Sequence, residues 1–493
     1  MNKPSPEAPP PSAAPPIAIL GVPFDNVTTL ETIELIEQMV ASKRPHYMAT
    51  ANVDFLVQAL HDVELRRILL DAHLVLCDGT PLVWASRLLG NPLPERVAGS
   101  DLVPLLIQIA AKKQYRIFFL GGTPEATQRA VSNLEKQFPD LTIAGHYSPP
   151  FSMLLEMDHD EIGRRISEAR PDLLFVAFGC PKQEKWIAMH YRALGVPVAV
   201  GVGATIDFLA GTARRAPVWM RRMGVEWVFR LAQEPRRLFR RYVSDLWWFG
   251  RAIVRQWWEL QLALRRFPQS EEMAPARGSD TWKRMRLPDR LDVKSVRQHS
   301  LLCEQALATC RHCLLDLSGV KFIDSTGMGL LIRLQKRARV TERKLILLAP
   351  STVVQSALKF MRLHDFFSIA RDMGEAQKLM DAEPMEAPVM QRPAYYASKP
   401  SLFWRGEVTA ANAEQVWEST HRYIASRANA RYPLLIDLTA LNFIDSTGVG
   451  IMLRAKKNAI QQGLKLVFTG TQPNVRNVLR LSKLETFLLG DTR

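Results

Sequence analysis

The sequence has few cysteines and no long apolar run. Its five cysteines, at positions 77, 180, 303, 310 and 313, are an odd and sparse set for 493 residues. Such a set argues against a disulfide framework and for a reducing compartment. No stretch of eighteen uncharged apolar residues occurs, so we expect no membrane-spanning helix. Residues 1–16 contain seven prolines and no apolar segment, which argues against a secretory signal and predicts an extended, solvated tail.

Metal-ligand spacing is also scarce. Cys310 and Cys313 form a Cys-x-x-Cys pair, but no second pair follows at the spacing of a zinc site. Two half-buried thiols, or thiols on a helix surface, are the simpler interpretation. The candidate loops of the N-terminal region contain no Asp-x-Asp pair. We therefore expect neither a bound metal nor an organic cofactor.

Positive charge is in excess and unevenly spread. The formal net charge is +15, and residues 214–267 alone hold thirteen arginines, four acidic residues and six of the eleven tryptophans. Basic proteins often bind nucleic acid. Arginines interleaved with indoles suit an anionic membrane surface better, so we expect no nucleic-acid partner. Charges at 251, 255 and 259 fall on one stripe, which predicts an interfacial helix within a basic helix and linker at 244–282. A core helix with a solvated basic face is the alternative.

The chain is long enough for two to four domains, and 47% apolar with 23% charged residues is typical of a globular protein. From residue 17 onward, short apolar segments alternate with helical patterns. This alternation predicts an α/β domain with a Rossmann-like, mostly parallel sheet over 17–243, with ligands at the carboxyl ends of its strands. The predicted strands are 17–22, 46–51, 74–77, 115–120, 141–145, 173–178 and 196–202, and the predicted helices include 30–41, 54–71, 124–138 and 160–169.

The last 210 or so residues contain an internal repeat. The segments Leu315–Gly329 and Ile436–Gly450 are identical at nine of fifteen positions, and each matched pair lies 121 residues apart. A period this long means tandem domains and not a solenoid. We expect two small α/β domains at 283–381 and 400–493, joined by a Pro-rich linker at 382–399.

Polar residues follow several predicted strands. Asp78 comes directly after the strand 74–77 and before Gly79, where a carboxylate suits a general base. A helix cap before Pro81 is the alternative. Asp54, in the loop Thr50-Ala-Asn-Val-Asp54, is a candidate N-cap.

Two further loops could hold a nucleotide. Gly121 and Gly122 could let backbone N–H groups approach a phosphate, although the third glycine of a dinucleotide fingerprint is absent. Lys182, Gln183 and Glu184 follow another strand and could hold a base, a ribose or a diphosphate. A surface turn is the alternative at 182–184.

Together these loops resemble the WecG/TagA/CpsF glycosyltransferases over about residues 18–243. The family transfers N-acetylmannosamine-type sugars from a UDP donor to N-acetylglucosamine on a polyprenyl diphosphate, with inversion at the anomeric carbon. The resemblance rests on Thr50-x-Asn52-x-Asp54, Asp78-Gly79, Arg96-x-x-Gly99-Ser-Asp101, Phe119-Leu-Gly-Gly122, Gly179-x-Pro-Lys-Gln-Glu184, Gly201-x-Gly203 with Asp207, Arg215-Ala-Pro217, Glu226-Trp227 and Glu234-Pro-Arg-Arg237.

The resemblance implies roles for particular residues. Asp78 would be the base that deprotonates the acceptor hydroxyl. The basic region would cover the site at the inner face of the cytoplasmic membrane, where the protein would be peripheral, and its arginines Arg215, Arg222, Arg230 and Arg237 would face the acceptor diphosphate. The substrate-binding residues would be Thr50, Asn52, Arg96, Gly121, Gly122, Lys182, Gln183, Glu184, Gly203 and Asp207.

Each repeat contains Asp-Ser-Thr-Gly between a predicted strand and a predicted helix. This motif resembles the STAS domains of anti-sigma factor antagonists and sulfate transporters. Ser325 and Ser446 could act as helix caps or as phosphorylation sites, and the antagonists carry their phosphoacceptor serine at this position. The resemblance therefore implies a kinase or regulatory protein as a partner.

Three functions are compatible with these patterns. The leading hypothesis is a glycosyltransferase for exopolysaccharide or cell-envelope glycans with a regulatory, partner-binding STAS tail. The second is a STAS signalling protein whose N-terminal domain only binds a sugar nucleotide. The third, an NAD-dependent oxidoreductase, is disfavoured because the glycine fingerprint is incomplete and no acidic ribose ligand stands at the expected distance.

Overall fold

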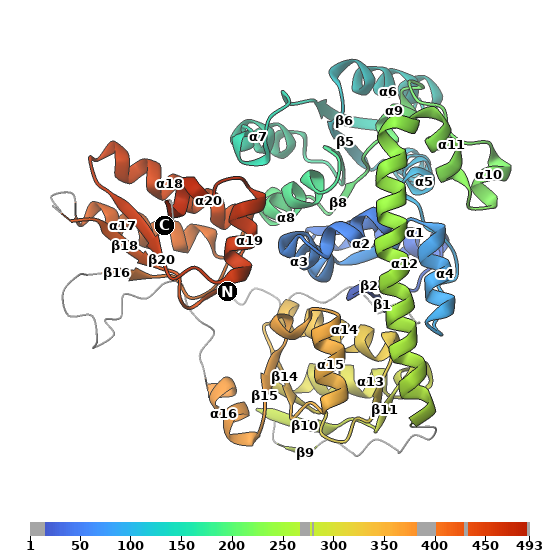
Figure 1. Ribbon diagram of the computed structural model, residues 1–493. Coiled ribbons are helices and arrows are strands. Elements are labelled where there is room, and N and C mark those ends of the chain that lie inside the picture. Colours follow the sequence, from blue (N-terminus) through green and yellow to red (C-terminus); the bar gives the residue numbers. More distant parts are fainter. Residues whose placement is uncertain (1–14, 267–276, 279–280, 382–400, 428–431, 491–493) are drawn as a thin grey trace.

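The structure is a computed structural model that describes residues 15–266, 277–278, 281–381, 401–427 and 432–490. Most of the predicted N-terminal tail and of the predicted linkers therefore lies outside the described residues. Figure 1 shows three α/β units, the first of which is accompanied by one long helix.

The N-terminal unit is built on a six-stranded sheet in the order β4-β3-β8-β7-β5-β6. All neighbouring strands are parallel, and helices cover both faces, which confirms the predicted fold class. One face packs against α1, α5 and α6, and the other packs against α2, α3 and α8. The strands are β3 His46–Ala51, β4 Leu74–Cys77, β5 Arg116–Gly121, β6 Thr142–Tyr147, β7 Leu173–Ala177 and β8 Val198–Gly201. The helices are α1 Thr29–Ser42, α2 Val53–Ala59, α3 Val63–Asp71, α4 Thr80–Leu88, α5 Gly99–Lys113, α6 Pro124–Gln137, α7 His159–Ala169 and α8 Lys182–Leu194.

Two predicted elements differ in the structure. The segment 17–22 is not a strand of the parallel sheet, because Leu20 and Gly21 adopt positive φ angles and turn the chain back on itself. The result is an antiparallel hairpin of β1 Ile17–Ile19 and β2 Val22–Phe24. The predicted helix 54–71 is two helices, α2 and α3, because the Asp62 side chain caps a new helix by accepting from the N–H of Leu65 at 3.0 Å.

After the sheet the chain forms the short helix α9 Thr205–Leu209. The described part of the basic region, which we define as residues 214–267, then forms α10 Val218–Arg222, α11 Glu226–Gln233 and the long helix α12 Pro235–Arg266. The 32 residues of α12 span about 48 Å. Phe249 and Ile253 on α12 are buried in the core that contains α2 and α3, whereas Trp247 is 68% exposed and Trp258 is 55% exposed. The helix is therefore a core helix on one side, and the opposite side presents indoles to solvent. The core-helix interpretation therefore holds for the side that bears Phe249 and Ile253, and the membrane-surface interpretation stays a prediction for the exposed side.

The two repeats that follow the basic region fold into two separate small α/β domains, whose strands are mostly parallel. The first is a sheet of β15-β14-β12-β10-β9, parallel except for β9, beside the parallel pair β11-β13. Its strands are β9 Arg277–Gly278, β10 Trp282–Arg286, β11 Arg290–Leu291, β12 His312–Asp316, β13 Phe322–Ile323, β14 Lys344–Leu348 and β15 Ser368–Ala370, and its helices are α13 Val293–Thr309, α14 Ser325–Val340, α15 Thr352–Phe360 and α16 Met373–Asp381. Cys310 and Cys313 are both buried in this domain, which corrects the expectation of half-buried or surface thiols.

The second repeat has a parallel sheet of β16-β18-β20 beside the parallel pair β17-β19. Its strands are β16 Ser401–Phe403, β17 Gly406–Val408, β18 Leu434–Asp437, β19 Leu441–Ile444 and β20 Leu466–Thr469, and its helices are α17 Ala413–Ala425, α18 Ser446–Gln461, α19 Pro473–Leu481 and α20 Glu485–Leu489. In both repeats the Asp-Ser-Thr-Gly motif begins the central helix, α14 or α18, and the aspartate caps it. The serine is thus the first helical residue and not the cap.

Candidate active site

Asp78 lies where β4 ends. Its backbone N–H donates to the carbonyl of Ala51, and its Oδ2 accepts from the N–H of Gly99 at 3.3 Å. Gly99 also lies against Thr50, since a Cβ added to this glycine would be 3.1 Å from Thr50 Oγ1. The ends of β3 and β4 and the start of α5 thus bring Asp78, Thr50 and Gly99 together.

The environment of Asp78 favours its protonated form. Burial raises the pKa of Asp78, and the charges of Arg96 and Arg230 and the hydrogen bond from Gly99 only partly oppose this effect. Its carboxylate is not the cap of α4, because this helix begins after Gly79 without a side-chain cap. A half-buried acid with raised proton affinity is suited to accept a proton from a hydroxyl.

The N-cap prediction for Asp54 is wrong. Asn52 caps α2 through its Oδ1, which accepts from the N–H of Phe55 at 3.2 Å, and Asp54 lies in the first turn. Asn52 also lies beside Gly79, whose added Cβ would be 3.8 Å from Asn52 Cβ. The side-chain oxygen of Asn52 is therefore engaged at the start of α2, beside the loop that follows Asp78.

Ion pairs beside Asp78 join Arg96 and two arginines of the basic region to carboxylates. Arg96 pairs with Asp101 at 2.6 Å and with Glu226 at 3.3 Å, and Arg230 pairs with Glu226 at 3.1 Å. Arg215 also reaches Asp101, at 2.7 Å. These pairs fasten α11 and the segment before α10 over the end of the sheet that holds Asp78.

The sequence did not assign Asp101 and Glu226 to the site, although both lie in the segments that carry the family resemblance. Burial tends to raise the pKa of Asp101, but Arg215, Arg96 and Arg221 outweigh it, so the pKa lies below its ordinary value. Arg221 binds Asp101 at 3.1 Å. The side chains of Arg222 and Arg237, which were predicted to face a diphosphate, lie outside the described residues.

The Lys182–Glu184 segment forms the first turn of α8. Gln183 Oε1 accepts from the N–H groups of Gly179 and Gly203, at 3.1 and 3.2 Å, and its Nε2 donates to Glu184 Oε1 at 2.7 Å. Gln183 and Glu184 are each only 4% exposed, so the surface-turn alternative fails for them. The side chains join the ends of β7 and β8.

Burial shifts the pKa values of Lys182 and Glu184, two residues of this segment, in opposite directions. Burial raises the pKa of Glu184 to about 7. Burial lowers the pKa of Lys182, whose Nζ donates to the carbonyl of Ser152 at 2.6 Å and lies over the rings of Phe151 and Phe178. An ammonium between two aromatic rings at the edge of the sheet is available to an anionic ligand.

The backbone conformation and a close contact with β7 explain the glycines at positions 121 and 122. Gly121 and Gly122 have φ angles of 96° and 74°, and a Cβ on Gly121 would lie 2.7 Å from the carbonyl oxygen of Ala177. The N–H of Gly122 donates to that same carbonyl at 3.1 Å. This donor, which was predicted to approach a phosphate, is thus engaged inside the sheet. Asp207 lies half-buried on α9, next to Phe208, whose ring receives the guanidinium groups of Arg215 and Arg230.

The structure therefore brings the predicted residues into two groups on adjacent strands. Asp78, Thr50 and Arg96 lie at the ends of β4 and β3, and Gln183, Glu184 and Gly203 lie at the ends of β8 and β7. Because these strands are consecutive in the sheet, the two groups line one edge. Among the described residues, no group of three or more His, Cys, Asp or Glu side chains is placed to hold a metal ion.

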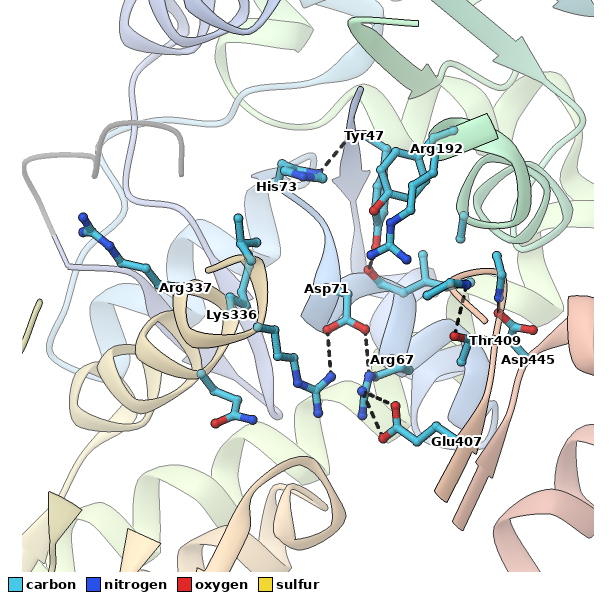
Figure 2. A pocket seen from close by; sticks show the side chains of 18 of the residues that line it. Tyr47, Arg67, Asp71, His73, Arg192, Lys336, Arg337, Glu407, Thr409 and Asp445 are labelled. Carbon is cyan, nitrogen blue, oxygen red and sulfur yellow. Dashed lines mark hydrogen bonds and ion pairs between the residues drawn. The ribbon is translucent and has the colours of Figure 1, made fainter. Parts of the chain in front are cut away.

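A cavity of about 720 Å³ lies elsewhere, between the N-terminal sheet domain and both repeats. None of the predicted site residues whose side chains the structure describes lines it. Figure 2 shows Arg67 of α3 inside it, between Asp71 and Glu407, with Lys336 and Arg337 of α14 on the opposite side. This cavity belongs to the junction of the domains and not to the sheet edge that holds Asp78.

Comparisons with known proteins agree with this geometry. The model of the glycosyl transferase WecG/TagA/CpsF family matches residues 17–263, and the model of the STAS domain matches residues 275–376 and 401–492. The first match identifies the N-terminal domain as a glycosyltransferase. The chain belongs to the WecG/TagA/CpsF family, with two STAS domains following the transferase domain.

Curated relatives include the N-acetylglucosaminyldiphosphoundecaprenol N-acetyl-beta-D-mannosaminyltransferases of Staphylococcus aureus strains MW2, NCTC 8325 and COL. Each is 31% identical over 226 residues, a match that covers 45% of this chain and 87% of the relative. Among solved structures, the anti-sigma factor antagonist SpoIIAA in its unphosphorylated form matches with 22% identity and a TM-score of 0.20, and covers 22% of this chain and 96% of its own. The Bacillus protein SpoIIAA in its phosphorylated form matches with 19% identity and a TM-score of 0.20, and covers 22% of this chain and 99% of its own.

Family membership decides among the three hypotheses raised by the sequence. The N-terminal domain is a glycosyltransferase of this family, so the oxidoreductase hypothesis and the purely signalling hypothesis are set aside. Within the described residues, no helix combines the length and the apolar character needed to cross a bilayer.

Proposed function

We propose that this protein transfers an N-acetylmannosamine-type sugar from a UDP donor to a sugar on a polyprenyl diphosphate, with inversion, in exopolysaccharide or cell-envelope glycan synthesis. The observation that supports it most directly is Asp78, a half-buried acid of raised pKa at the carboxyl end of β4, beside Arg96 and Arg230. The S. aureus relatives bear the name of that transfer.

The chemistry needs one base and a means to stabilise the leaving group. Asp78 accepts the proton of the acceptor hydroxyl. The hydroxyl oxygen of the acceptor forms a bond to the anomeric carbon of the donor, and the bond from that carbon to the UDP oxygen breaks. The departing UDP gains charge, which the guanidinium groups of Arg96, Arg215 and Arg230 and the ammonium of Lys182 offset. The reaction then proceeds without a cofactor.

The acceptor's lipid places the reaction at a membrane. The exposed side of α10 to α12 has tryptophans and arginines together, with Trp219 59%, Trp227 44% and Trp247 68% exposed. Indoles favour the bilayer interface and arginines favour anionic headgroups. The basic region thus holds the enzyme peripherally on the inner face of the cytoplasmic membrane while it closes over the site through Asp101 and Glu226.

The test uses the full chain, UDP-N-acetylmannosamine and a short polyprenyl-diphosphate N-acetylglucosamine, and it measures both UDP release and product mass. Asp78→Asn keeps the size of the side chain and an oxygen that can accept from Gly99, but it removes the base. We expect kcat to fall by about 10²- to 10⁴-fold. Asp140→Asn, a change of an exposed acid in the same domain, is the control.

A wild-type rate in Asp78→Asn would exclude Asp78 as the base. A panel of other UDP-sugars measures donor choice separately. If neither UDP-N-acetylmannosamine nor any UDP-sugar of the panel yields a lipid-linked product with the wild-type enzyme, the proposed reaction itself is wrong.

A further inference from the structure

The serine of each STAS motif faces the transferase domain. Ser325 and Ser446 are both only 3% exposed, although each begins a helix at the edge of its own domain. In Figure 1, α14 lies beside the hairpin β1-β2 and α12, and the second STAS domain approaches α3 and α8 from the other side. In each STAS domain, the surface that bears the motif is therefore covered by the transferase domain.

Glu64 of α3 receives the second motif. Its Oε2 accepts from the hydroxyl of Ser446 at 2.9 Å, and its Oε1 accepts from the backbone N–H of the same residue. Glu64 is 1% exposed, so this contact is buried. A carboxylate placed at the N-terminus of the 16-residue helix α18 gains from the free N–H groups and the helix dipole.

Three carboxyl groups and one ammonium meet at this contact. Lys185 pairs with Glu64 at 2.8 Å and with Asp62 at 2.7 Å, so one ammonium serves two carboxylates. Asp445 adds a third acid, whose pKa burial raises to about 7, with a further contribution from Glu64. A phosphate on Ser446 would place about two more negative charges there.

The first motif meets a neutral partner. Gln256 of α12 donates from Nε2 to the hydroxyl of Ser325 at 2.8 Å and to the carbonyl of Ala18 at 3.1 Å, while its Oε1 accepts from the N–H of Leu20. Gln256 is 5% exposed. One amide thus ties the long basic helix, the β1-β2 hairpin and the first STAS domain together.

Backbone contact is equally close on this side. A Cβ added to Gly329, in the second turn of α14, would lie 2.3 Å from the carbonyl oxygen of Pro16. The corresponding residue of the second repeat, Gly450, has only Leu155 Cδ2 near its added Cβ, at 4.0 Å. The first STAS domain therefore packs against the transferase backbone at a position where only glycine fits.

Further contacts join the same surfaces. Arg67 of α3 pairs with Glu407 of the second STAS domain at 2.9 Å, and its guanidinium lies over Phe366 of the first and Phe443 of the second. Arg66 donates to the carbonyl of Met361 at 2.7 Å. The helix α3 is consequently the shared docking element of both STAS domains.

We propose that the partner of the tandem STAS pair is the transferase domain of its own chain, which both Asp-Ser-Thr-Gly motifs bind, and that negative charge added at Ser446 releases the second STAS domain from α3. Because Ser446 is covered when docked, a kinase reaches it only in the released state. The kinase transfers the γ-phosphoryl group of a nucleoside triphosphate to the serine oxygen, the nucleoside diphosphate leaves, and the phosphate on Ser446 then prevents return. The neutral amide of Gln256 makes the first contact less sensitive to charge.

The test is a charge-rescue cycle in the full chain, read by hydrogen–deuterium exchange of α3 and of the first turns of α18. Asp at a first helical position suits a helix, so Ser446→Asp leaves the second STAS domain folded. We expect S446D to raise exchange of both segments at least 10-fold, while Ser446→Ala, which keeps the backbone contact to Glu64, raises it less than 3-fold.

The combined variant decides the cause. E64Q removes the opposing charge, so S446D with E64Q returns exchange most of the way to that of E64Q alone. Equal exchange in S446D and wild type, or no rescue by E64Q, would overturn the release proposal. Circular dichroism of each variant separates release from unfolding: a loss of helix in S446D that E64Q does not restore counts against it as well.

The first contact is tested by a matched pair of glycine substitutions. Gly329→Ala meets the Pro16 carbonyl and should raise exchange of the β1-β2 hairpin at least 5-fold, whereas Gly450→Ala, at the same place in the other repeat, should leave that exchange unchanged. If Gly329→Ala leaves the hairpin protected, the first STAS domain does not dock as proposed.

Discussion

The buried carboxyl of Glu184 makes the stability of the transferase domain depend on pH. Glu184 is 4% exposed in the first turn of α8, and burial raises its pKa from the ordinary 4.5 to about 7. Below pH 4.5 the group is protonated in both the folded and unfolded chains, so its favourable contribution is complete. As pH rises through 7, the folded protein must hold a buried carboxylate and that contribution is lost.

The size of the effect follows from the pKa difference. Each unit between the folded and unfolded pKa corresponds to about 1.4 kcal/mol, so ionising Glu184 lowers the free energy of unfolding by about 3 kcal/mol. Glu184→Gln keeps an oxygen that can accept from Gln183 Nε2 but cannot ionise. We expect this variant to match wild type at pH 4.5 and to be about 3 kcal/mol more stable at pH 8.

Urea unfolding of both proteins at several pH values checks this expectation. Trp186 is buried on the same helix, and Trp186→Phe identifies its fluorescence change among those of the other tryptophans. Glu34→Gln, an exposed change on α1, is the control and should leave the pH profile unchanged. Parallel profiles for wild type and Glu184→Gln would refute the reasoning.

Two further predictions concern the sheet edge and the basic region. Gly121→Ala combines a positive φ with a Cβ 2.7 Å from the Ala177 carbonyl oxygen, so we expect it to lower the free energy of unfolding by about 2 kcal/mol or more in urea unfolding. Gly195 also has a positive φ, but an added Cβ there meets open space, so Gly195→Ala should lower the free energy of unfolding by only about 1 kcal/mol. An equal loss in both would mean that the close approach is unimportant. Trp247→Ser should weaken binding to anionic vesicles several-fold in a sedimentation assay, whereas Phe151→Ser, a change of an exposed residue outside the basic region, should not. Binding that does not fall with added salt would contradict the electrostatic share assigned to the arginines.

Several structural features could be read from the sequence because they are local. The alternation of apolar strands and amphipathic helices predicted the parallel sheet, and the spacing of 121 residues predicted two tandem domains, which the resemblance of their Asp-Ser-Thr-Gly motif identified as STAS domains. The break in the predicted helix 54–71 was missed because apolar periodicity continues across it, while the cap at Asp62 depends on one side-chain hydrogen bond. The hairpin at 17–24 was missed because Leu20 adopts a positive φ that its residue type does not announce.

The candidate site was predictable in part for the same reason. The carboxyl ends of parallel strands meet at one edge, so residues that follow strands, such as Asp78 and Gln183, were expected to lie along it. The partners Asp101 and Glu226 were not assigned, because whether a carboxylate pairs with a distant arginine depends on how α11 folds back over the sheet. The role of Gly122 also changed once the Ala177 carbonyl was found within reach of its N–H.

The sequence by itself determined a parallel-sheet domain followed by a duplicated domain, since periodicity and repetition can be read along the chain, and its motifs carried the resemblance to a glycosyltransferase family. Only the tertiary structure decided where the duplicated motif points. Ser446 and Glu64 are 382 residues apart in the chain, and no local pattern relates them. Their contact exists because three separately folded units bury surface against one another, and that burial places a serine hydroxyl on a carboxylate of the enzyme.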